Sequence, residues 1–145
     1  MIEGLILTPL KVFESDLGDV LHGIKNHEES FCGFGEAYFS TVNYRVTKGW
    51  KRHSQMTLNL IVPCGTIKFV IYDGRSESRT YSEIFEVNLS KDNYQRLTVP
   101  PMLWMAFHGV GEGLNMLLNV ANLPHDPLES ETINLEGNHI PYNWT

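Results

Sequence analysis

Short runs of alternating apolar and polar residues, each closed by a turn signal, are the feature that most restricts the fold of this chain. The run MTLNLIV (56–62) ends in Pro-Cys-Gly, and TIKFVIYDG (66–74) ends in Asp-Gly. Alternation places successive side chains on opposite faces of a strand, and such turns are typical between strands. The sequence therefore predicts an all-β chain. Comparable runs occupy 36–46, 81–90, 95–101 and 114–122.

The spacing of these turns predicts a sandwich or barrel, because they recur close to every 8–12 residues. No stretch with a helical period exceeds a few turns, so helix is expected only in short turns near 26–31 or 90–94. With 145 residues and no repeat or linker, one domain over 1–145 is predicted. The polar tail ends in Tyr142 and Trp144, and these aromatic residues predict that it packs back on the body.

Charge and cysteine content exclude several classes of protein. A net charge of -6 disfavours nucleic-acid binding, because a phosphate backbone requires a basic face. No apolar run is long enough to cross a bilayer, and the first residues lack the apolar core of a signal peptide, so a cytoplasmic protein without a membrane partner is expected. Cys32 and Cys64 have no metal-type spacing and are expected to be buried free thiols.

The stretch KGWKRHSQMTLNLIVPCG (48–65) places cations and a histidine before a strand-like run. Metal-binding cupins carry His-x-His, a nearby Glu and a later His, since residues two apart on a strand face the same way. Here the pair reads Lys51-x-His53, the Glu position falls near Thr57 or Leu58, and the later His position falls at Met105. These residue types do not make a metal site unless the distant His108 or His125 folds back to join His53, so neither a metal nor another cofactor is expected.

Acid–base chemistry is the alternative for this stretch. A neutral imidazole is the usual acceptor when a C–H beside a ketone loses its proton, which makes His53 a candidate base. Lys51 lies on the same strand face and could stabilise the enolate oxygen, whereas Arg52 points to the other face. The alternative role of His53 is to form hydrogen bonds within the sheet, and the pattern alone favours this structural role.

Other residues are candidates for contacts with a ligand. Tyr38 is a candidate proton donor, and core packing is its alternative role. The local cations suit either a small anion such as a diphosphate or a solvated strand end. Trp50 and Trp104 could stack on a base or sugar, and Asn residues at strand positions that favour apolar side chains suggest a polar cavity. The cations are Arg45, Lys48 and Arg52, and the amides are Asn59, Asn115 and Asn119.

Nearly the whole chain resembles the sugar-nucleotide-modifying cupins grouped with dTDP-4-dehydrorhamnose 3,5-epimerase. TPLKVFESDLGDVLH is similar to the family's opening strand and turn, and KGWKRH takes the place of its Arg-Gly-Leu-His block. LSKDNYQRLTVPPMLWMAF resembles its Ser-x-x-Asn and Pro-x-Gly segment, and the ending NLPHDPLESE…IPYNW resembles a short epimerase-related subgroup. The resemblance implies a double-stranded β-helix, also described as a jelly-roll barrel, and a homodimer.

The resemblance also shows where this chain departs from its family. Lys51 takes the place of the catalytic His, and His53 follows two positions later. The family's catalytic Tyr falls near Leu118 or Asn119, and the Asp that orients the base has Glu136 as its nearest counterpart. The usual catalytic set is thus largely replaced.

Together, these features predict a metal-free epimerase that acts on a nucleoside-diphosphate 4-keto-6-deoxy sugar through an enolate, in the synthesis of a bacterial surface polysaccharide. A sugar-nucleotide 3,4-ketoisomerase of the same fold is the first alternative, because its family members use His-x-His where this chain has Lys51-x-His53. A sugar-nucleotide-binding cupin without catalysis is the second.

Overall fold

The computed structural model describes residues 1–137 and 139–144, and its regular elements in this part are nearly all strands. Ten strands form two five-stranded sheets. The first sheet has the spatial order β1 (Ile6–Pro9), β9 (Gln95–Val99), β6 (Leu58–Cys64), β11 (Met116–Ala121), β4 (Glu36–Thr41). The second has the order β12 (Ser130–Thr132), β5 (Thr47–His53), β10 (Trp104–Gly109), β7 (Thr66–Tyr72), β8 (Ile84–Ser90).

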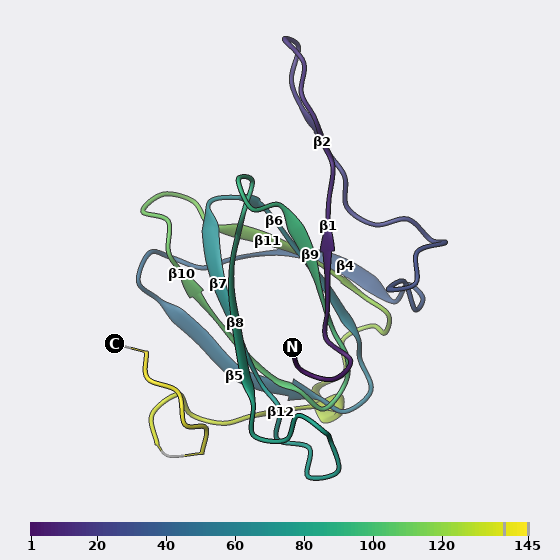
Figure 1. Cartoon of the computed structure of the whole chain (residues 1–145). Coiled ribbons are helices and arrows are strands. Elements are labelled where there is room, and N and C mark those ends of the chain that lie inside the picture. Colours follow the sequence, from purple (N-terminus) through teal and green to yellow (C-terminus); the bar gives the residue numbers. More distant parts are fainter. Residues whose placement is uncertain (138, 145) are drawn as a thin grey trace.

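The two sheets lie face to face and enclose the main hydrophobic core (Figure 1). All strand pairs within them are antiparallel. Ile67, Phe69 and Ile71 alternate along β7 into this core and are fully buried, as are Leu89 and Leu97 from neighbouring elements. Burial of each such side chain stabilises the fold by about 1.5–3 kcal/mol. The all-β prediction is confirmed.

Strand β10 (Trp104–Gly109) was not expected from the sequence pattern, because WMAFHG does not alternate. It pairs with both β5 and β7, and its two faces are covered, one by the core and the other by the C-terminal tail. A strand covered on both faces has no reason to alternate. The helical turns expected near 26–31 and 90–94 are wrong. In the described residues, the helical element is the short η1 (Pro127–Glu129).

The C-terminal tail packs on the outer face of the second sheet, as the sequence predicts. The Trp50 ring lies 5.7 Å from that of Trp144, and the Tyr142 hydroxyl donates to Glu86 at 2.6 Å. With Val70 and other apolar residues they form a second hydrophobic cluster outside the barrel. The tail therefore fixes the outer face of β5, which leaves the inner face of that strand to line the interior.

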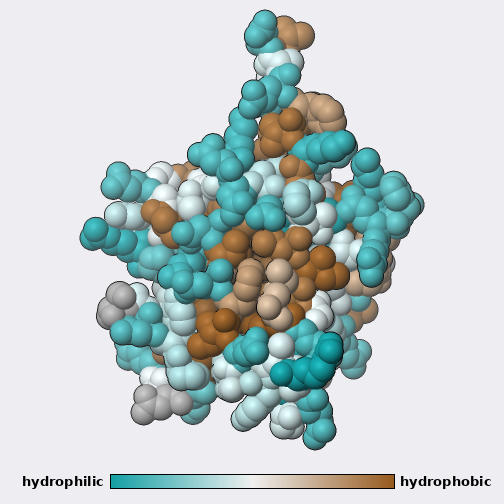
Figure 2. Space-filling view, viewed as in Figure 1, coloured by the Kyte–Doolittle hydropathy of each residue, from teal (hydrophilic) through white to brown (hydrophobic). Residues whose placement is uncertain are grey.

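A two-stranded arm, β2 (Val12–Phe13) and β3 (Val20–Leu21), protrudes from the barrel (Figure 1). It exposes the apolar side chains of Phe13, Leu17 and Val20. Figure 2 shows apolar surface on this arm and in the middle of the face between β8 and β1, amid hydrophilic surroundings. A two-stranded ribbon is marginally stable alone, so the arm is a segment that would gain from a covering partner.

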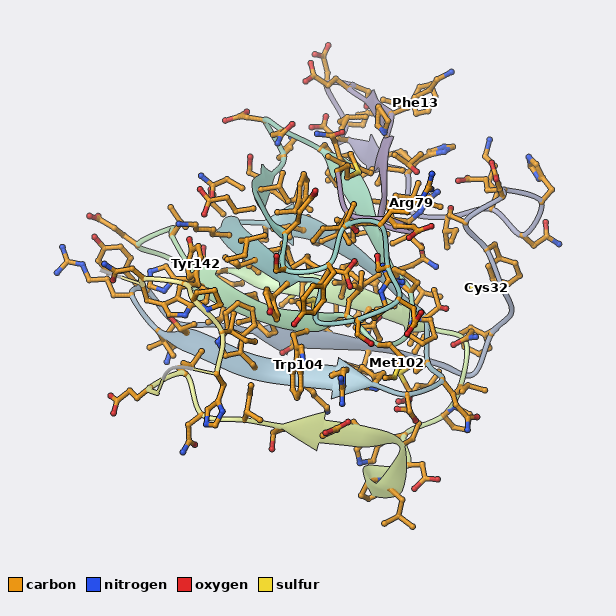
Figure 3. All side chains as sticks on the ribbon, turned by 60° about the horizontal axis from the view of Figure 1, so that its bottom comes forward. Phe13, Cys32, Arg79, Met102, Trp104 and Tyr142 are labelled. Carbon is orange, nitrogen blue, oxygen red and sulfur yellow. The ribbon has the colours of Figure 1, made fainter. Side chains whose placement is uncertain are left out.

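The two cysteines are exposed, so the prediction of buried thiols is wrong. Cys32 lies on the connection before β4, away from the sheets (Figure 3). Cys64 is the last residue of β6, beside the turn at Gly65. The apolar and glycine neighbours of the two cysteines in the sequence do not distinguish these positions from core positions. None of the helical structure described is long and apolar enough to span a membrane.

Candidate active site

A cavity of about 280 Å³ opens between the two sheets, on the side where β4 and β12 are edge strands. Its walls are mainly apolar, with a few polar and charged groups directed into it, which is the composition expected of a ligand site. The first sheet contributes Tyr38, Ser40, Leu58, Leu60, Leu117 and Asn119. The second contributes Lys48, Gly49, Lys51, His53, Met105, Phe107 and Thr132.

A β-bulge in β5 brings an additional cation into the cavity. Lys51 pairs with Met105 and Lys48 with Phe107, so two residues of β5 oppose the single residue Ala106 of β10. Strict alternation would place Lys48 and Lys51 on opposite faces, and the inserted residue puts both on the inner face. Gly49 is needed there, because its φ is +136° and an added Cβ would lie 2.6 Å from the Ala106 Cβ.

His53 stands at the cavity end of β5 and is held by a carboxylate. Its Nδ1–H donates to Glu129 Oε1 at 2.5 Å. The backbone N–H groups of Gln55 and Met56 donate to Glu129 Oε2, each at 2.9 Å. Both oxygens of the carboxylate are therefore engaged, and the imidazole proton is fixed on Nδ1. This tautomer leaves Nε2 with its lone pair, as a base requires.

Glu129 was not found from the sequence, which gave Glu136 as the nearest counterpart of the family's aspartate. Glu136 is exposed and does not line the cavity. Burial alone would raise the pKa of Glu129, but hydrogen bonds from His53, Gln55 and Met56 hold that pKa below its ordinary value. The contact depends on the pairing of β12 with β5, in which Ser130 stands opposite His53. No local spacing encodes that pairing.

Lys51 differs from the other cations near β5. It lines the cavity with His53, and within the described residues its ammonium has no hydrogen-bond or ion-pair partner. Leu58 and Met105 also line the cavity. The positions that bind metal in related barrels correspond here to Lys51, His53, Leu58 and Met105, and the structure brings these four side chains together. The described residues contain no cluster of three or more His, Cys, Asp or Glu able to hold a metal ion.

Tyr38 and Asn119 form a pair on the wall across from β5. They stand opposite each other in the register of β4 and β11, and Asn119 Nδ2 donates to the Tyr38 hydroxyl at 3.0 Å. Asn119 is 2% exposed. Lys48 also reaches toward β4, where its Nζ donates to the Thr41 carbonyl at 2.6 Å. Five sequence candidates are thus brought together: His53, Lys51, Tyr38, Lys48 and Asn119.

Arg45, Arg52 and Trp104 lie away from the cavity, contrary to their predicted role in substrate binding. Arg52 is ion-paired with Glu131, and its guanidinium lies 4.6 Å from the ring centre of Trp104 on the outer face. Trp104 is therefore covered by Arg52 rather than open to a ligand. Arg45 stacks on the exposed Tyr44 ring.

Trp50 and Asn59 are also outside the cavity. Trp50 is 1% exposed beneath the C-terminal tail. Asn59 donates to the Ser30 carbonyl at 3.1 Å and accepts from Thr98 at 2.6 Å. Asn115 likewise satisfies its amide with backbone groups, donating to the Gly111 carbonyl at 2.8 Å. Asn59 and Asn115 are thus satisfied by structural partners, and of the three predicted amides Asn119 lines the cavity.

Comparison with known proteins identifies the family. Residues 2–145 match the dTDP-4-dehydrorhamnose 3,5-epimerase family. The chain belongs to this family. The crystal structure of a dTDP sugar isomerase from Desulfovibrio desulfuricans superposes on 99% of the chain and 92% of its own, with 39% identity and a TM-score of 0.95. The predicted family and its cupin barrel are confirmed.

Two curated relatives connect the family to polysaccharide synthesis. The spore coat polysaccharide biosynthesis protein SpsL of Bacillus subtilis is 23% identical over 99% of the chain and 97% of its own length. The probable low-salt glycan biosynthesis epimerase Agl13 of Haloferax volcanii is 29% identical over 57% of the chain. The match spans about half of the haloarchaeal protein, 54% of its length. These relatives agree with the sequence prediction of an epimerase in polysaccharide synthesis.

Proposed function

We propose that this family member epimerises a nucleoside-diphosphate 4-keto-6-deoxy sugar through an enolate. One observation carries the proposal. The His53–Glu129 pair and Lys51, which has no partner among the described residues, face the same cavity, so a base and a cation are available to one substrate. The match to a dTDP sugar isomerase over nearly the full length supports the class of substrate. The relative from B. subtilis supports a role in polysaccharide synthesis.

Each residue has a defined part in the reaction. His53 Nε2 takes the proton from the carbon beside the ketone, and the C–H electron pair moves to form the enolate, whose charge lies on the former ketone oxygen. The Lys51 ammonium attracts this oxygen more strongly in the enolate than in the ketone, so the contact lowers the barrier. Glu129 keeps the ring proton on Nδ1 and stabilises the imidazolium that forms.

The remaining groups of the cavity suit the rest of a sugar nucleotide. Lys48 is the sequence-predicted diphosphate contact that the bulge brings to the cavity, and it would act as a point charge. Leu58, Leu60 and Leu117 present an apolar surface that a 6-deoxy sugar can cover with its methyl group without leaving a hydroxyl unpaired.

The test is proton exchange in deuterated water, followed by proton NMR. The substrates are dTDP-, GDP-, UDP- and CDP-linked 4-keto-6-deoxy sugars. Deuterium uptake beside the ketone with inversion of configuration supports the proposal. A carbonyl that moves to C3 would instead identify a ketoisomerase, and tight binding without exchange would identify a binding protein.

We propose that the reaction needs no metal, because Lys51, Leu58 and Met105 occupy the positions at which related barrels place ligands. Unchanged turnover after treatment with a chelator is the expected result. Loss of turnover that zinc, iron or manganese restores would contradict it. We also propose that the enzyme works in the cytoplasm, where cell fractionation would find it.

A homodimer is the proposed assembly, supported by two apolar surfaces. The arm exposes Phe13, Leu17 and Val20, and edge strand β4 exposes Phe39 on the face opposite to Tyr38. A second copy could cover both kinds of surface. Light scattering should give twice the chain mass, and a monomer mass at working concentration would contradict the proposal.

A further inference from the structure

Inversion of a carbon centre requires proton donors and acceptors on two faces of the sugar. The base and the enolate-stabilising cation of the proposed reaction both come from β5, in the second sheet. A proton returned by the same histidine would arrive on the face that it left, and the configuration would be kept. A donor from the opposite wall is therefore needed, and that wall belongs to the first sheet.

Tyr38 and Asn119 are the polar pair on that wall. Asn119 Nδ2 donates to the Tyr38 oxygen at 3.0 Å, which occupies one lone pair and leaves the phenol O–H free to donate. Within the described residues this O–H has no acceptor. Asn119 is buried within β11, at 2% exposed, and its Oδ1 has no hydrogen-bond partner among the described residues. The amide thus fixes the phenol oxygen at the cavity wall.

The position of this pair differs from the family pattern that the resemblance implies. The resemblance to the family places its catalytic Tyr near Leu118 or Asn119, on β11, and this chain has an Asn there. The residue opposite Asn119 on β4 is Tyr38. A phenol is thus present at nearly the same place on the wall, but it comes from the neighbouring strand and is connected to β11 through the amide.

We infer that Tyr38 returns the proton to the enolate on the face opposite to His53, and that Asn119 is the positioning residue that aims the Tyr38 hydroxyl. The inference rests on the proposed function. In this step the phenol O–H breaks, the new C–H forms, and the enolate electron pair restores the ketone. The phenolate left behind accepts the Asn119 N–H bond and is reprotonated from solvent, so that His53 releases its proton and Tyr38 regains one in each turnover.

Removal of the proton and inversion of the configuration can be measured separately. Removal of the proton needs His53, whereas inversion needs both His53 and Tyr38. In Tyr38→Phe the enolate can still form, and His53, after exchanging its proton with deuterated water, returns deuterium to the original face. Tyr38→Phe should therefore continue to take up deuterium while its rate of inversion falls roughly 10²–10⁴-fold. His53→Asn should lose both processes.

The experiment measures deuterium uptake and inversion by proton NMR with the sugar nucleotides named above. Tyr44→Phe is the matched control, because Tyr44 is outside the cavity and stacks on Arg45. Circular dichroism and thermal unfolding show whether each variant is folded. Normal inversion by Tyr38→Phe would overturn the inference, and so would joint loss of exchange and inversion in a folded Tyr38→Phe. Failure of exchange in the unaltered protein would overturn the proposed function and this inference together.

Asn119→Leu tests the positioning role separately. Without the amide, the phenol is no longer aimed, so inversion should slow about tenfold relative to exchange. Asn119→Gln, which keeps an amide near the hydroxyl, should recover part of the loss. A merely structural role would lower exchange and inversion in equal proportion, and that result would remove Asn119 from the mechanism.

Discussion

The two faces of strand β5 carry similar residues but differ in how the side chains are paired. On the outer face, Arg52 is paired with Glu131 and stacked on Trp104, and Trp50 is sealed beneath the tail. On the inner face, Lys51 has no partner in the described residues and His53 has the single carboxylate of Glu129. A cation of β5 that is paired with a carboxylate on the outer face is structural, whereas one that faces the cavity without a carboxylate partner in the described residues is available to a ligand.

Physical chemistry explains why the difference matters. A charged group in an apolar cavity, without a counter-ion, loses hydration and gains little in return, so a protein retains it at a cost. Such groups are found where function needs them. Arg96 shows the opposite case: its side chain is fully buried, and its two terminal nitrogens donate to the Gly23 carbonyl, Glu28 and Ser30, although its Nε has no partner among the described residues. These bonds attach the segment that contains Gly23, Glu28 and Ser30 to the first sheet.

The largest expected effect is at the base on the inner face. His53→Asn should lower turnover by roughly 10²–10⁴-fold, because general-base catalysis contributes about that much. Binding of the sugar nucleotide should remain close to that of the unaltered protein. Initial rates by proton NMR and affinity by calorimetry measure the two quantities. Full turnover in His53→Asn would require a base elsewhere in the cavity.

Loss of the Lys51 cation should have the next largest effect. Lys51→Met keeps most of the side-chain length but removes the charge that faces the enolate. Turnover should fall by about 10²–10³-fold, the usual cost of removing one group that stabilises an oxyanion. The effect should appear in kcat more than in KM, because the contact strengthens in the transition state. An effect confined to KM would show that Lys51 only holds the substrate.

Glu129 supports the inner face by fixing the histidine tautomer. In Glu129→Gln, the amide oxygen would face the N–H groups of Gln55 and Met56, so its NH₂ would face His53 Nδ1. The ring proton would then move to Nε2, the atom that must be the base. Turnover should fall by about 10²-fold or more, with the folded structure kept. The ring NMR signals of His53 should report the changed tautomer, and unchanged signals with unchanged turnover would contradict the assignment.

The same residue predicts a pH dependence of stability. Because the pKa of Glu129 is held below its ordinary value of 4.5, its contribution is present above that pH and is lost as the pH falls through the folded-state pKa. Urea unfolding at neutral pH and near pH 4 should therefore show a smaller acid-induced loss of unfolding free energy in Glu129→Gln. Equal losses in both proteins would mean that Glu129 does not carry the acid-induced loss of stability.

Sequence reasoning predicted the alternating strands well and the polar contacts poorly. Lys51 and His53 were placed on one face because alternation is local, and the structure agrees. The bulge that brings in Lys48 depends on the pairing of β5 with β10, and the contact of Glu129 with His53 spans 76 positions. The sequence also did not show that Trp50 and Asn59 point away from the cavity, because residue type and spacing do not determine which layer covers each face of a strand.

The smallest expected effect, at Arg52, is the most direct test of the comparison between the two faces. Its ion pair is partly exposed, with side-chain exposures of 20% for Arg52 and 56% for Glu131, so water screens it. Arg52→Met should lower the unfolding free energy by only about 1 kcal/mol, from the lost pair and the cation–π contact with Trp104. Turnover should stay within about twofold of that of the unaltered protein, because a satisfied outer cation contributes nothing to the transition state. Lys51→Met makes the same chemical change one residue away. If both variants lost turnover to the same extent, exposure to the cavity would not decide which cation of β5 takes part in the reaction.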